Sequence, residues 1–538
     1  MNILIFENKL KSKISNSIKE LYDLDIEVEL EKPNDLQNGN FSTNIALKLT
    51  KELKLNPLEI ATSIKDNLSV CDKFERVEVA KPGFINFYMS NNFYSLILES
   101  IDNEFGTLEP NDDKYLVEYV SANPTGDLHL GHARGAVYGD SLIKIMKTAG
   151  YNVDSEYYLN DFGSQMNNLG ESVKHFYYQK LGLDYPLVED GYKGKDIQHI
   201  ASTLYEEYKE NAKDESLEFF VEYGYKINLQ GIKDLMKDMN IVFDNWVSER
   251  ELHSSGKVKD VLEVLKGSGD LYEEDGAMWL KTTKHHDEKD RVIQKKDGQF
   301  TYFASDIAYH IDKYNRGYDH LIDIWGADHH GYVPRVKSAI ASLGKDANSF
   351  EVPIVQMVSV LDDGKAVKMS KRLGTSVTIK ELLEQIDIDA LRYIFVMRSL
   401  DTQLEFDIKI AKEKSMENPI YYIQYANARM SKVLKDIKAL NIEDNIDLSN
   451  LSLLEQELID KISIYPKVIK ECAQKRLPHI LANYIYDLAS IFHKYYNQEK
   501  VFETNNINIK NKEYIYSKLY LVMKLALNNI GIESKEEM

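Results

Sequence analysis

Apolar residues recur with two spacings along the chain, and the changes between them predict its main parts. Over residues 1–110, runs with helical spacing (Asn8 to Leu21 and Ser42 to Leu53) stand beside a short strand-like run, Gly83 to Tyr88. Apolar positions at i, i+3 and i+4 indicate an amphipathic helix, whereas a short run rich in aromatic and β-branched residues indicates a strand. The first part is therefore predicted to be a small α+β domain.

Strand–loop–helix units come next. Tyr115 to Val120 is predicted to be a strand, His129 to Thr148 a helix, and Asn152 to Leu159 the following strand. A second unit repeats the arrangement, with a strand over Leu321 to Trp325 and a helix over Tyr332 to Leu343. Such units in series predict a parallel sheet whose ligand crevice lies at the carboxyl ends of its strands.

Three domains follow from these runs. Residues 1–110 form the α+β domain, and residues 111–386 a Rossmann-type parallel-sheet domain with an insertion over roughly residues 183–300. Beyond Asp387 helical spacing dominates, so residues 387–538 are assigned to an all-helical bundle. Its predicted helices cover Leu391 to Met397, Ile420 to Ala439, Leu454 to Cys472 and His479 to Tyr496.

Composition narrows the class of protein. The chain has 538 residues, of which 43% are hydrophobic and 28% charged, as in folded globular proteins. No apolar run reaches the roughly 18 residues that a membrane span needs, and charges from Glu7 to Lys13 interrupt any signal-peptide stretch. Cys71 and Cys472 are too few for a thiolate zinc site. We therefore expect a cytoplasmic protein without a tightly bound metal.

The charge is unevenly distributed. The net charge is −20, which by itself argues against a nucleic-acid partner. From Asp387 to the end, however, 21 Lys and Arg residues stand against 22 Asp and Glu residues, so this part carries −1 and the rest carries −19. A nearly neutral C-terminal part permits contact with a polyanion through local patches without requiring it.

Two histidines begin the first helix of the parallel-sheet domain, in the sequence His129–Leu130–Gly131–His132. At i and i+3 they project near one face of the helix, at the end where free N–H groups and the helix dipole favour anions. Gly131 leaves room for a flat base or ribose to approach the backbone. These features suit a nucleoside triphosphate, although four residues alone could equally be an incidental helix start.

A basic segment follows the last strand of the same domain. Gly364 to Arg372 contains four cations and no anion, after a probable hairpin turn at Asp362 to Gly364. Thr378 and Glu381 then have the spacing of a capping box that opens the next helix. The cations could neutralise charge that develops on a leaving pyrophosphate. Taken alone, the segment could also be a solvated charge run.

Together the histidine pair and Lys368–Met369–Ser370–Lys371 resemble the two signature motifs of class I aminoacyl-tRNA synthetases, with Arg372 the one departure from the second consensus. The residues around the first motif, Glu118 to His132, are similar to the arginyl-tRNA synthetase form. Asp389–Ala390–Leu391–Arg392 matches the tetrapeptide that names that family's helical anticodon-binding domain, and Gly39 to Asn44 resembles its N-terminal tRNA-binding domain. The resemblance covers essentially the whole chain.

The resemblance implies an arginine–tRNA ligase that uses ATP with Mg²⁺ and takes L-arginine and tRNA(Arg) as substrates, as a monomer. It implies catalytic roles for His129, His132, Lys368 and Lys371. It implies ATP-binding roles for Gly131, Gly326, Asp328, His329, His330, Met369 and Ser370. It implies arginine-binding roles for Glu118, Asn123, Tyr302 and Asp306. Tyr425, Arg429 and Asn497 are the candidates for tRNA contact.

Two other functions stay open on the residues alone. One is a class I synthetase for another amino acid, such as glutamate or glutamine, and an acidic substrate would need arginines where Glu118 and Asp306 stand. A non-catalytic RNA-binding protein built on a synthetase fold would be favoured by loss of His129, His132 or Lys371, all of which are present. Glu118 could otherwise be a charge at a strand end, and Asp306 an acid in the first turn of a helix.

Overall fold

The computed structural model describes residues 3–33, 35–68, 72–366, 378–443 and 445–538. The predicted site residues Lys368, Met369, Ser370 and Lys371 lie outside these ranges. None of the described helices is long and apolar enough to cross a membrane.

The N-terminal part is the expected small α+β domain. In its described residues it contains a three-stranded antiparallel sheet in the order β1-β3-β2 together with four α-helices. The predicted helix at Ser42 begins later, because the fully buried residues 41–43 pair with β3 as a strand. The elements are α1 (Ile3–Tyr22), β1 (Phe41–Thr43), α2 (Ile45–Leu53), α3 (Pro57–Asn67), β2 (Phe74–Ala80), β3 (Phe84–Met89) and α4 (Asn91–Glu99).

A five-stranded parallel sheet forms the centre of the second part, in the order β12-β10-β4-β5-β6. Its strands are β4 (Lys114–Glu118), β5 (Asn152–Leu159), β6 (Asn245–Ser248), β10 (His320–Asp323) and β12 (Phe350–Glu351). The order of connection reverses between β4 and β10, which is where a doubly wound sheet opens its ligand crevice. The predicted Rossmann-type fold is therefore confirmed, and the carboxyl ends of β4 and β10 are the place to look for a site.

Helix α5 (Leu130–Thr148) follows β4 and is buried on nearly every side. It packs so closely on the chain after β4 that a Cβ at Gly139 would lie 2.4 Å from Cγ of Tyr119. A helix that is buried all round belongs to the interior of a large protein rather than to its surface. The first motif is thus carried by a central, tightly packed element.

The predicted insertion is divided in two by a strand of the main sheet. Helices α6 (Ser164–Lys180), α7 (Lys195–Tyr208) and α8 (Leu217–Asp238) form one lobe with its own apolar core. β6 then returns to pair with β5. A second lobe contains α9 (Glu249–Ser254), α10 (Lys257–Lys266), β7 (Leu271–Glu274), β8 (Ala277–Leu280), β9 (Arg291–Gln294), α11 (Tyr302–Asn315) and α12 (Val333–Ser342).

A small second sheet lies beside the main one. β14 (Val358–Asp362) and β15 (Lys365–Ala366) form the predicted hairpin, and β14 also pairs in parallel with β16 (Leu404–Asp407). β16 corrects the expectation that everything beyond Asp387 is helical. Its Leu404 and Phe406 are buried while Glu405 is exposed, which is the alternation of a half-buried strand. Two short strands, β11 (Trp325–Gly326) and β13 (Ile354–Val355), pair nearby.

The C-terminal part is the expected helical domain. α13 (Ile379–Leu383) precedes it, and its helices are α14 (Ile388–Val396), α15 (Ile408–Lys412), α16 (Pro419–Ala439), α17 (Leu453–Ser463), α18 (Tyr465–Lys475), α19 (Pro478–Gln498) and α20 (Asn506–Asn529). The single helix predicted over Leu454 to Cys472 is wrong. It is broken into α17 and α18, because Pro466 has no N–H to donate and its ring excludes the carbonyl four residues earlier.

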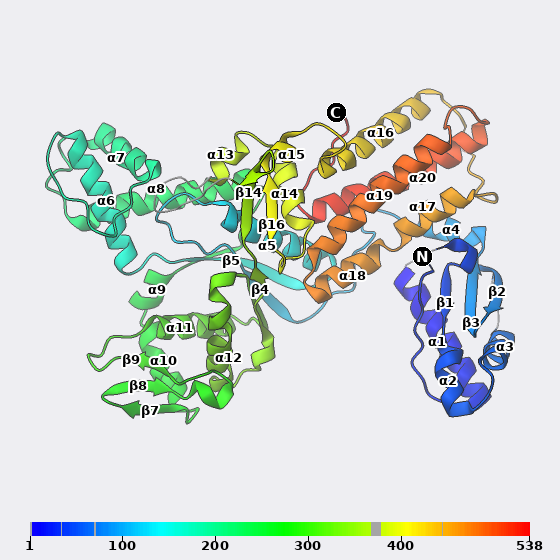
Figure 1. The fold of residues 1–538 in the computed structure, drawn as a ribbon, viewed down its shortest axis with the longest axis horizontal. Coiled ribbons are helices and arrows are strands. Elements are labelled where there is room, and N and C mark those ends of the chain that lie inside the picture. Colours follow the sequence, from blue (N-terminus) through cyan, green and yellow to red (C-terminus); the bar gives the residue numbers. More distant parts are fainter. Residues whose placement is uncertain (1–2, 34, 69–71, 367–377, 444) are drawn as a thin grey trace.

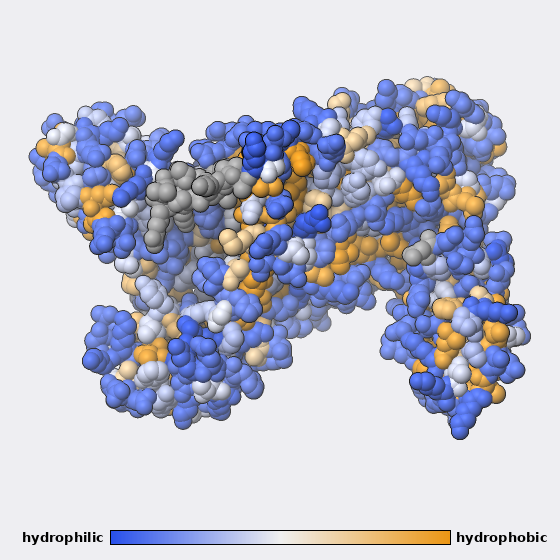
Figure 2. Space-filling model, viewed as in Figure 1, coloured by the Kyte–Doolittle hydropathy of each residue, from blue (hydrophilic) through white to orange (hydrophobic). Residues whose placement is uncertain are grey.

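The helical domain joins the other parts (Figure 1). The N-terminal domain lies below α17, and the two lobes of the parallel-sheet part extend on the opposite side. Figure 2 shows a mainly hydrophilic surface that is hollowed between the N-terminal domain and the lower lobe. At the joint, Lys32 and Asn40 of the N-terminal domain both contact Asp460 of α17, at 3.4 and 3.1 Å.

The close packing of α5 gives a stability prediction. Gly139→Ala should lower the free energy of unfolding by about 1–3 kcal/mol, because the new methyl group would overlap the ring of Tyr119. Gly231→Ala in α8 is the matched control, since nothing lies within 4 Å of the added atom. That change should stabilise the helix by up to about 1 kcal/mol. Urea denaturation of both variants tests the prediction, which fails if Gly139→Ala is neutral.

Candidate active site

The histidine pair lies at the first turn of α5, beside the carboxyl end of β4. The rings of His129 and His132 stack with centroids 4.0 Å apart and an interplanar angle of 23°. The backbone N–H of His129 donates to Nδ1 of His132 at 3.3 Å. Gly131 between them is exposed, and a Cβ there would lie 3.7 Å from the nearest atom of His129. Such a contact is ordinary van der Waals distance, so the face of this glycine is not crowded.

The chain on either side of the second motif meets the first motif. The β14–β15 hairpin turns through Asp363 and Gly364, whose positive φ angles of 52° and 71° suit a two-residue turn. On the far side, Thr378 forms an antiparallel bridge with His129, and the N–H of Ile379 donates to the carbonyl of Leu128 at 3.0 Å. The predicted capping box of Thr378 with Glu381 is present.

Glu118 lies at the end of β4 with its charge already compensated. Its carboxylate accepts hydrogen bonds from Lys313 at 2.5 Å and from Ser121 at 2.8 Å. Lys313 is wholly buried and also contacts Asp323 of β10 at 2.8 Å. Burial raises the pKa of the Glu118 carboxyl despite this lysine. One buried cation therefore serves two carboxylates on neighbouring strands.

The turn after β4 is strained. Val120 and Ser121 have φ angles of 69° and 42°, which a β-branched residue such as valine rarely adopts. The strain directs the hydroxyl of Ser121 so that it donates to Glu118 and accepts from the N–H of Tyr158 at 3.1 Å. Strained backbone of this kind is concentrated at functional sites.

Asp306 and Tyr302 lie in the first turns of α11, facing this turn from the other lobe. Asp306 is half-buried and accepts a hydrogen bond from the hydroxyl of Tyr332. Burial raises the pKa of its carboxyl, and the hydrogen bond opposes that shift. Tyr302 is 74% exposed. Asn123, also predicted, donates to Gln165 at the start of α6.

Glu249 is the residue that the sequence did not reveal. It is 4% exposed, and its Oε1 lies 3.8 Å from Nε2 of His253. Burial, then the nearby charges of Asp306 and Asp161, raise the pKa of its carboxyl to about 7. In the sequence it follows Ser248, an N-cap residue, so it reads as an ordinary acid in the first turn of a helix.

The negative charges of this region gather around Tyr158 of β5. The carboxylates of Glu249, Asp306, Glu118 and Asp161 all help burial to raise the pKa of its hydroxyl. Asp161 is satisfied by the hydroxyl of Ser248 at 2.8 Å and the N–H of Arg250 at 3.0 Å. With Glu118 paired to Lys313, the carboxylates of Asp161, Asp306 and Glu249 form no salt bridge with a Lys or Arg among the described residues.

The remaining predicted residues form two groups, the ATP-binding candidates near the end of β10 and the tRNA-binding candidates in the helical domain. Gly326 lies in β11, and the exposed Asp328, His329 and His330 lie on the short helix Ala327–Tyr332 after β10. His329 approaches Asp328 at 3.5 Å. No group of three or more metal-ligating side chains occurs among the described residues.

The predicted tRNA contacts come together on α16 and α19. The guanidinium of Arg429 lies 4.4 Å from the ring centroid of Tyr425 and 4.8 Å from that of Tyr496. Tyr425 also stacks on His493 with centroids 5.8 Å apart. Asn497, next to Tyr496, is exposed. Half-buried aromatic rings beside a guanidinium are the kind of surface on which unpaired bases stack.

Comparison with known proteins covers nearly the whole chain. Family models match residues 8–89 (arginyl tRNA synthetase N terminal domain), 96–397 (tRNA synthetases class I (R), catalytic domain) and 423–538 (DALR anticodon binding domain). Among curated relatives, the arginine–tRNA ligase of Geobacillus kaustophilus is 46% identical over 530 residues, covering 95% of this chain and 94% of the relative. That of Bacillus subtilis is 44% identical over 531 residues, with the same coverage of both chains.

Solved structures agree on the fold. The arginyl-tRNA synthetase structure of Thermus thermophilus matches with a TM-score of 0.77 at 21% identity, covering 99% of this chain and 100% of that one. A methionyl-tRNA synthetase of Mycobacterium tuberculosis matches less well, with a TM-score of 0.57 over 78% of this chain and 91% of that one, at 11% identity. With its three matching domains and its histidine pair at the crevice of a parallel sheet, this chain belongs to the arginyl-tRNA synthetase family of class I.

Proposed function

We propose that this chain, as an arginine–tRNA ligase, joins arginine to tRNA(Arg) in two steps. In the first, the arginine carboxylate attacks the α-phosphorus of ATP, and the bond to the bridging oxygen breaks to release pyrophosphate. In the second, a ribose hydroxyl of the terminal adenosine of tRNA attacks the carbonyl carbon, and AMP leaves. The observation that supports the proposal is a histidine pair at the start of the helix after β4, together with a cluster of carboxylates around Tyr158 of the neighbouring strand β5.

Catalysis of the first step rests on position and charge rather than on a covalent enzyme intermediate. His129 and His132 contact the triphosphate at the start of α5, and Lys368 and Lys371 neutralise the departing pyrophosphate. Gly131, Met369 and Ser370, with Gly326 and the residues 328–330, line the nucleotide. Mg²⁺ arrives on ATP, in keeping with its preference for phosphate oxygens over an all-protein cage.

Arginine binds in the acidic pocket around Tyr158. A guanidinium is a planar fork that two carboxylates hold well, and neither Asp306 nor Glu249 forms a salt bridge with a Lys or Arg among the described residues. Glu118 contributes an acceptor rather than net charge, because Lys313 already neutralises it. Tyr302 covers the side chain, and Asn123 binds near the substrate's backbone. An acidic or amide substrate would meet repulsion or unpaired carboxylates here.

Replacing Glu249 is predicted to increase stability at high pH while it weakens the binding of arginine. Its carboxyl has a pKa of about 7 in the folded arginine-free protein and about 4.5 when unfolded. Between these values the folded state keeps a proton that the unfolded state has lost, so stability falls as pH rises. Glu249→Gln should therefore raise the free energy of unfolding at pH 8 by up to about 3 kcal/mol, with the gain vanishing below about pH 4.5. It should also raise KM for arginine at least about tenfold.

Glu251→Gln is the matched control, because it removes the same charge from the exposed face of the same helix. It should change neither quantity. Urea denaturation at pH 5 and pH 8 without arginine, together with KM for arginine and for ATP, tests the assignment. Loss of stability in Glu249→Gln at pH 8, or an unchanged KM for arginine, would remove Glu249 from the pocket.

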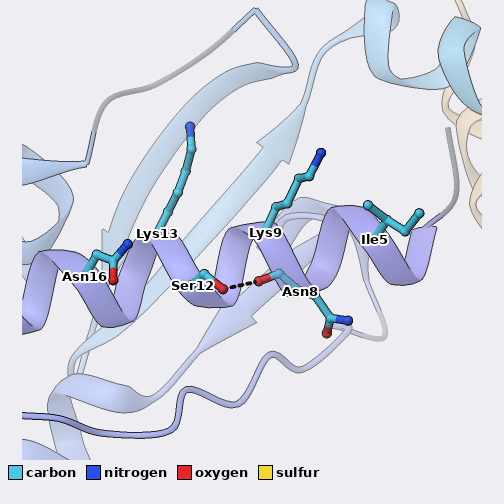
Figure 3. A pocket seen from close by; sticks show the side chains of 6 residues that line it. All are labelled: Ile5, Asn8, Lys9, Ser12, Lys13 and Asn16. Atoms are coloured by element: carbon cyan, nitrogen blue, oxygen red, sulfur yellow. Dashed lines mark hydrogen bonds between the residues drawn. The ribbon is translucent and has the colours of Figure 1, made fainter.

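Contact with tRNA involves both terminal domains, and we retain the boundaries 110/111 and 386/387 between them and the catalytic part. Anticodon bases stack on the surface of Tyr425, Arg429 and Tyr496, with Asn497 at its edge. In the N-terminal domain, one face of α1 lines a groove of about 380 Å³ and presents only amide, hydroxyl and lysine groups besides Ile5 (Figure 3). We further propose that the chain acts as a monomer in the cytoplasm.

The groove on α1 gives a prediction for tRNA. Lys9 and Lys13 point from the same side of the helix and pair with no carboxylate of the described residues (Figure 3). Four residues of helix span about 6 Å, so the two charges can follow successive phosphates. Lys9→Glu with Lys13→Glu should raise KM for tRNA at least about tenfold and reduce the salt slope of binding by about 2. KM for arginine and ATP should stay unchanged.

Lys11→Glu is the control for the two lysines. It makes the same change of charge on α1 as Lys9→Glu or Lys13→Glu alone, with which it is compared, but Lys11 does not line the groove. Filter binding of tRNA at several salt concentrations compares the variants. Equal loss of affinity in Lys11→Glu would mean that only the total charge of the domain matters.

The overall function is tested by charging total tRNA with each standard amino acid separately, in the presence of ATP and Mg²⁺. Charging with arginine alone is the expected result. Charging with another amino acid would overturn the pocket while leaving the fold. Binding of tRNA without charging by any amino acid would favour the non-catalytic alternative.

A further inference from the structure

We propose that Arg134 is a positioning residue that fixes the β14–β15 hairpin against the histidine pair. The proposal rests on the proposed roles of the two motifs in ATP activation. Arg134 lies two residues after His132, in the second turn of α5, and its side chain is completely buried. It contacts no substrate in this arrangement, so any effect on the reaction is exerted through other parts of the chain.

The guanidinium of Arg134 joins three backbone carbonyls from two segments. One terminal nitrogen donates to the carbonyls of Gln356 at 2.9 Å and Thr402 at 2.7 Å, and the other donates to that of Ser399 at 2.8 Å. No carboxylate of the described residues bonds to it. All of the hydrogen bonds described for this charged side chain are therefore made to main-chain carbonyls.

Both segments belong to the sheet that carries the hairpin. Gln356 lies two residues before β14, and its N–H donates to the carbonyl of Leu400 at 3.1 Å. The turn that contains Ser399 and Thr402 leads into β16, whose four residues pair in parallel with β14. The fork of Arg134 therefore holds the base of the hairpin and the strand beside it to the first turns of α5.

A second contact fixes the return of the chain. The bridge between His129 and Thr378, with the hydrogen bond from Ile379 to Leu128, ties the start of α13 to the residues just before α5. The chain that enters the second motif and the chain that leaves it are both attached to the turn that carries the histidines. Arg134 supplies the attachment on the entering side.

The position is unfavourable for a cation, which argues that the fork itself is required. Burial lowers the pKa of the Arg134 guanidinium, and the amino-terminal end of a helix repels positive charge. Its Nε atom is buried and has no hydrogen-bond partner among the described residues. Three carbonyls in different directions need the planar five-donor fork, which a lysine ammonium does not reproduce.

Arg134→Lys and Arg134→Met, assayed by ATP–pyrophosphate exchange with tRNA present, test the proposal. Both should lower kcat/KM for ATP at least about tenfold, because the hairpin loses its placement in either case. KM for arginine should change less than about twofold, since the pocket of Glu118, Asp306 and Glu249 comes from β4, α11 and α9. A loss in kcat/KM for ATP without a change in KM for arginine is the result expected if Arg134 positions the part of the site that binds ATP.

Arg392→Lys is the matched control. Arg392 is equally buried and also donates to backbone carbonyls, those of Ile530 at 3.0 Å and Met239 at 2.8 Å, but it meets α5 beyond the first turns. Arg392→Lys should lower the melting temperature, and any loss of activity should affect the kinetic constants for ATP and for arginine alike. A lower melting temperature in the Arg134 variants with unchanged kcat/KM for ATP, or full activity in Arg134→Lys, would overturn the proposal.

The wild-type exchange reaction and His132→Ala separate this proposal from the proposed function. If the wild type exchanges and His132→Ala does not, while the Arg134 variants keep their kcat/KM for ATP, the positioning role alone has failed. If the wild type shows no exchange with arginine, the function itself has failed.

Discussion

The arrangement of the molecule depends on a buried ion pair between Asp140 of α5 and Arg392 of α14. The guanidinium also donates to the carbonyls of Met239, just after α8, and Ile530, just after α20. One side chain thus joins the catalytic helix, the end of the helical lobe and the end of the anticodon domain. Removing one partner of such a pair typically costs about 3–5 kcal/mol. The family tetrapeptide that contains Arg392 is therefore explained as a joint rather than as an RNA contact.

The buried carboxylates near the carboxyl ends of β4, β5 and β10 are of two kinds, those that pair with a cation and those that do not. Lys313 is shared by Glu118 and Asp323, and Arg316 pairs with Glu156, so each of these buried acids on the strands contacts a cation. Asp306 and Glu249 form no salt bridge with a Lys or Arg among the described residues. Burial, then the neighbouring charges of Asp306 and Asp161, raise the pKa of the Glu249 carboxyl to about 7. The proposed substrate, arginine, would bring to this cluster the cation that it lacks.

Much of this was accessible from the sequence, and the failures have physical causes. The spacing of apolar residues located β5, α16 and α19 within two residues, since each is a long periodic run. It could not detect the break at Pro466, because apolar spacing continues across it. β16 was missed since four residues are too few to show a period. Glu249 is affected by Asp306 and Asp161, and Lys313 pairs with Glu118, across about 60 to 200 residues; no local pattern in a single sequence records such contacts.

Arg134 and Arg392 together explain how one helix can serve two distant tasks. Arg392 fixes the middle of α5 to the helical domain, and Arg134 fixes its first turns to the sheet that carries the second motif. Both use the fork of arginine on backbone carbonyls, so both constrain main chain rather than the choice of side chains. Because a closely packed interior transmits strain, a helix that is held at two points moves together with the segments to which it is attached. The orientation of the helix that begins at the histidine pair is consequently set by the same contacts that join the domains.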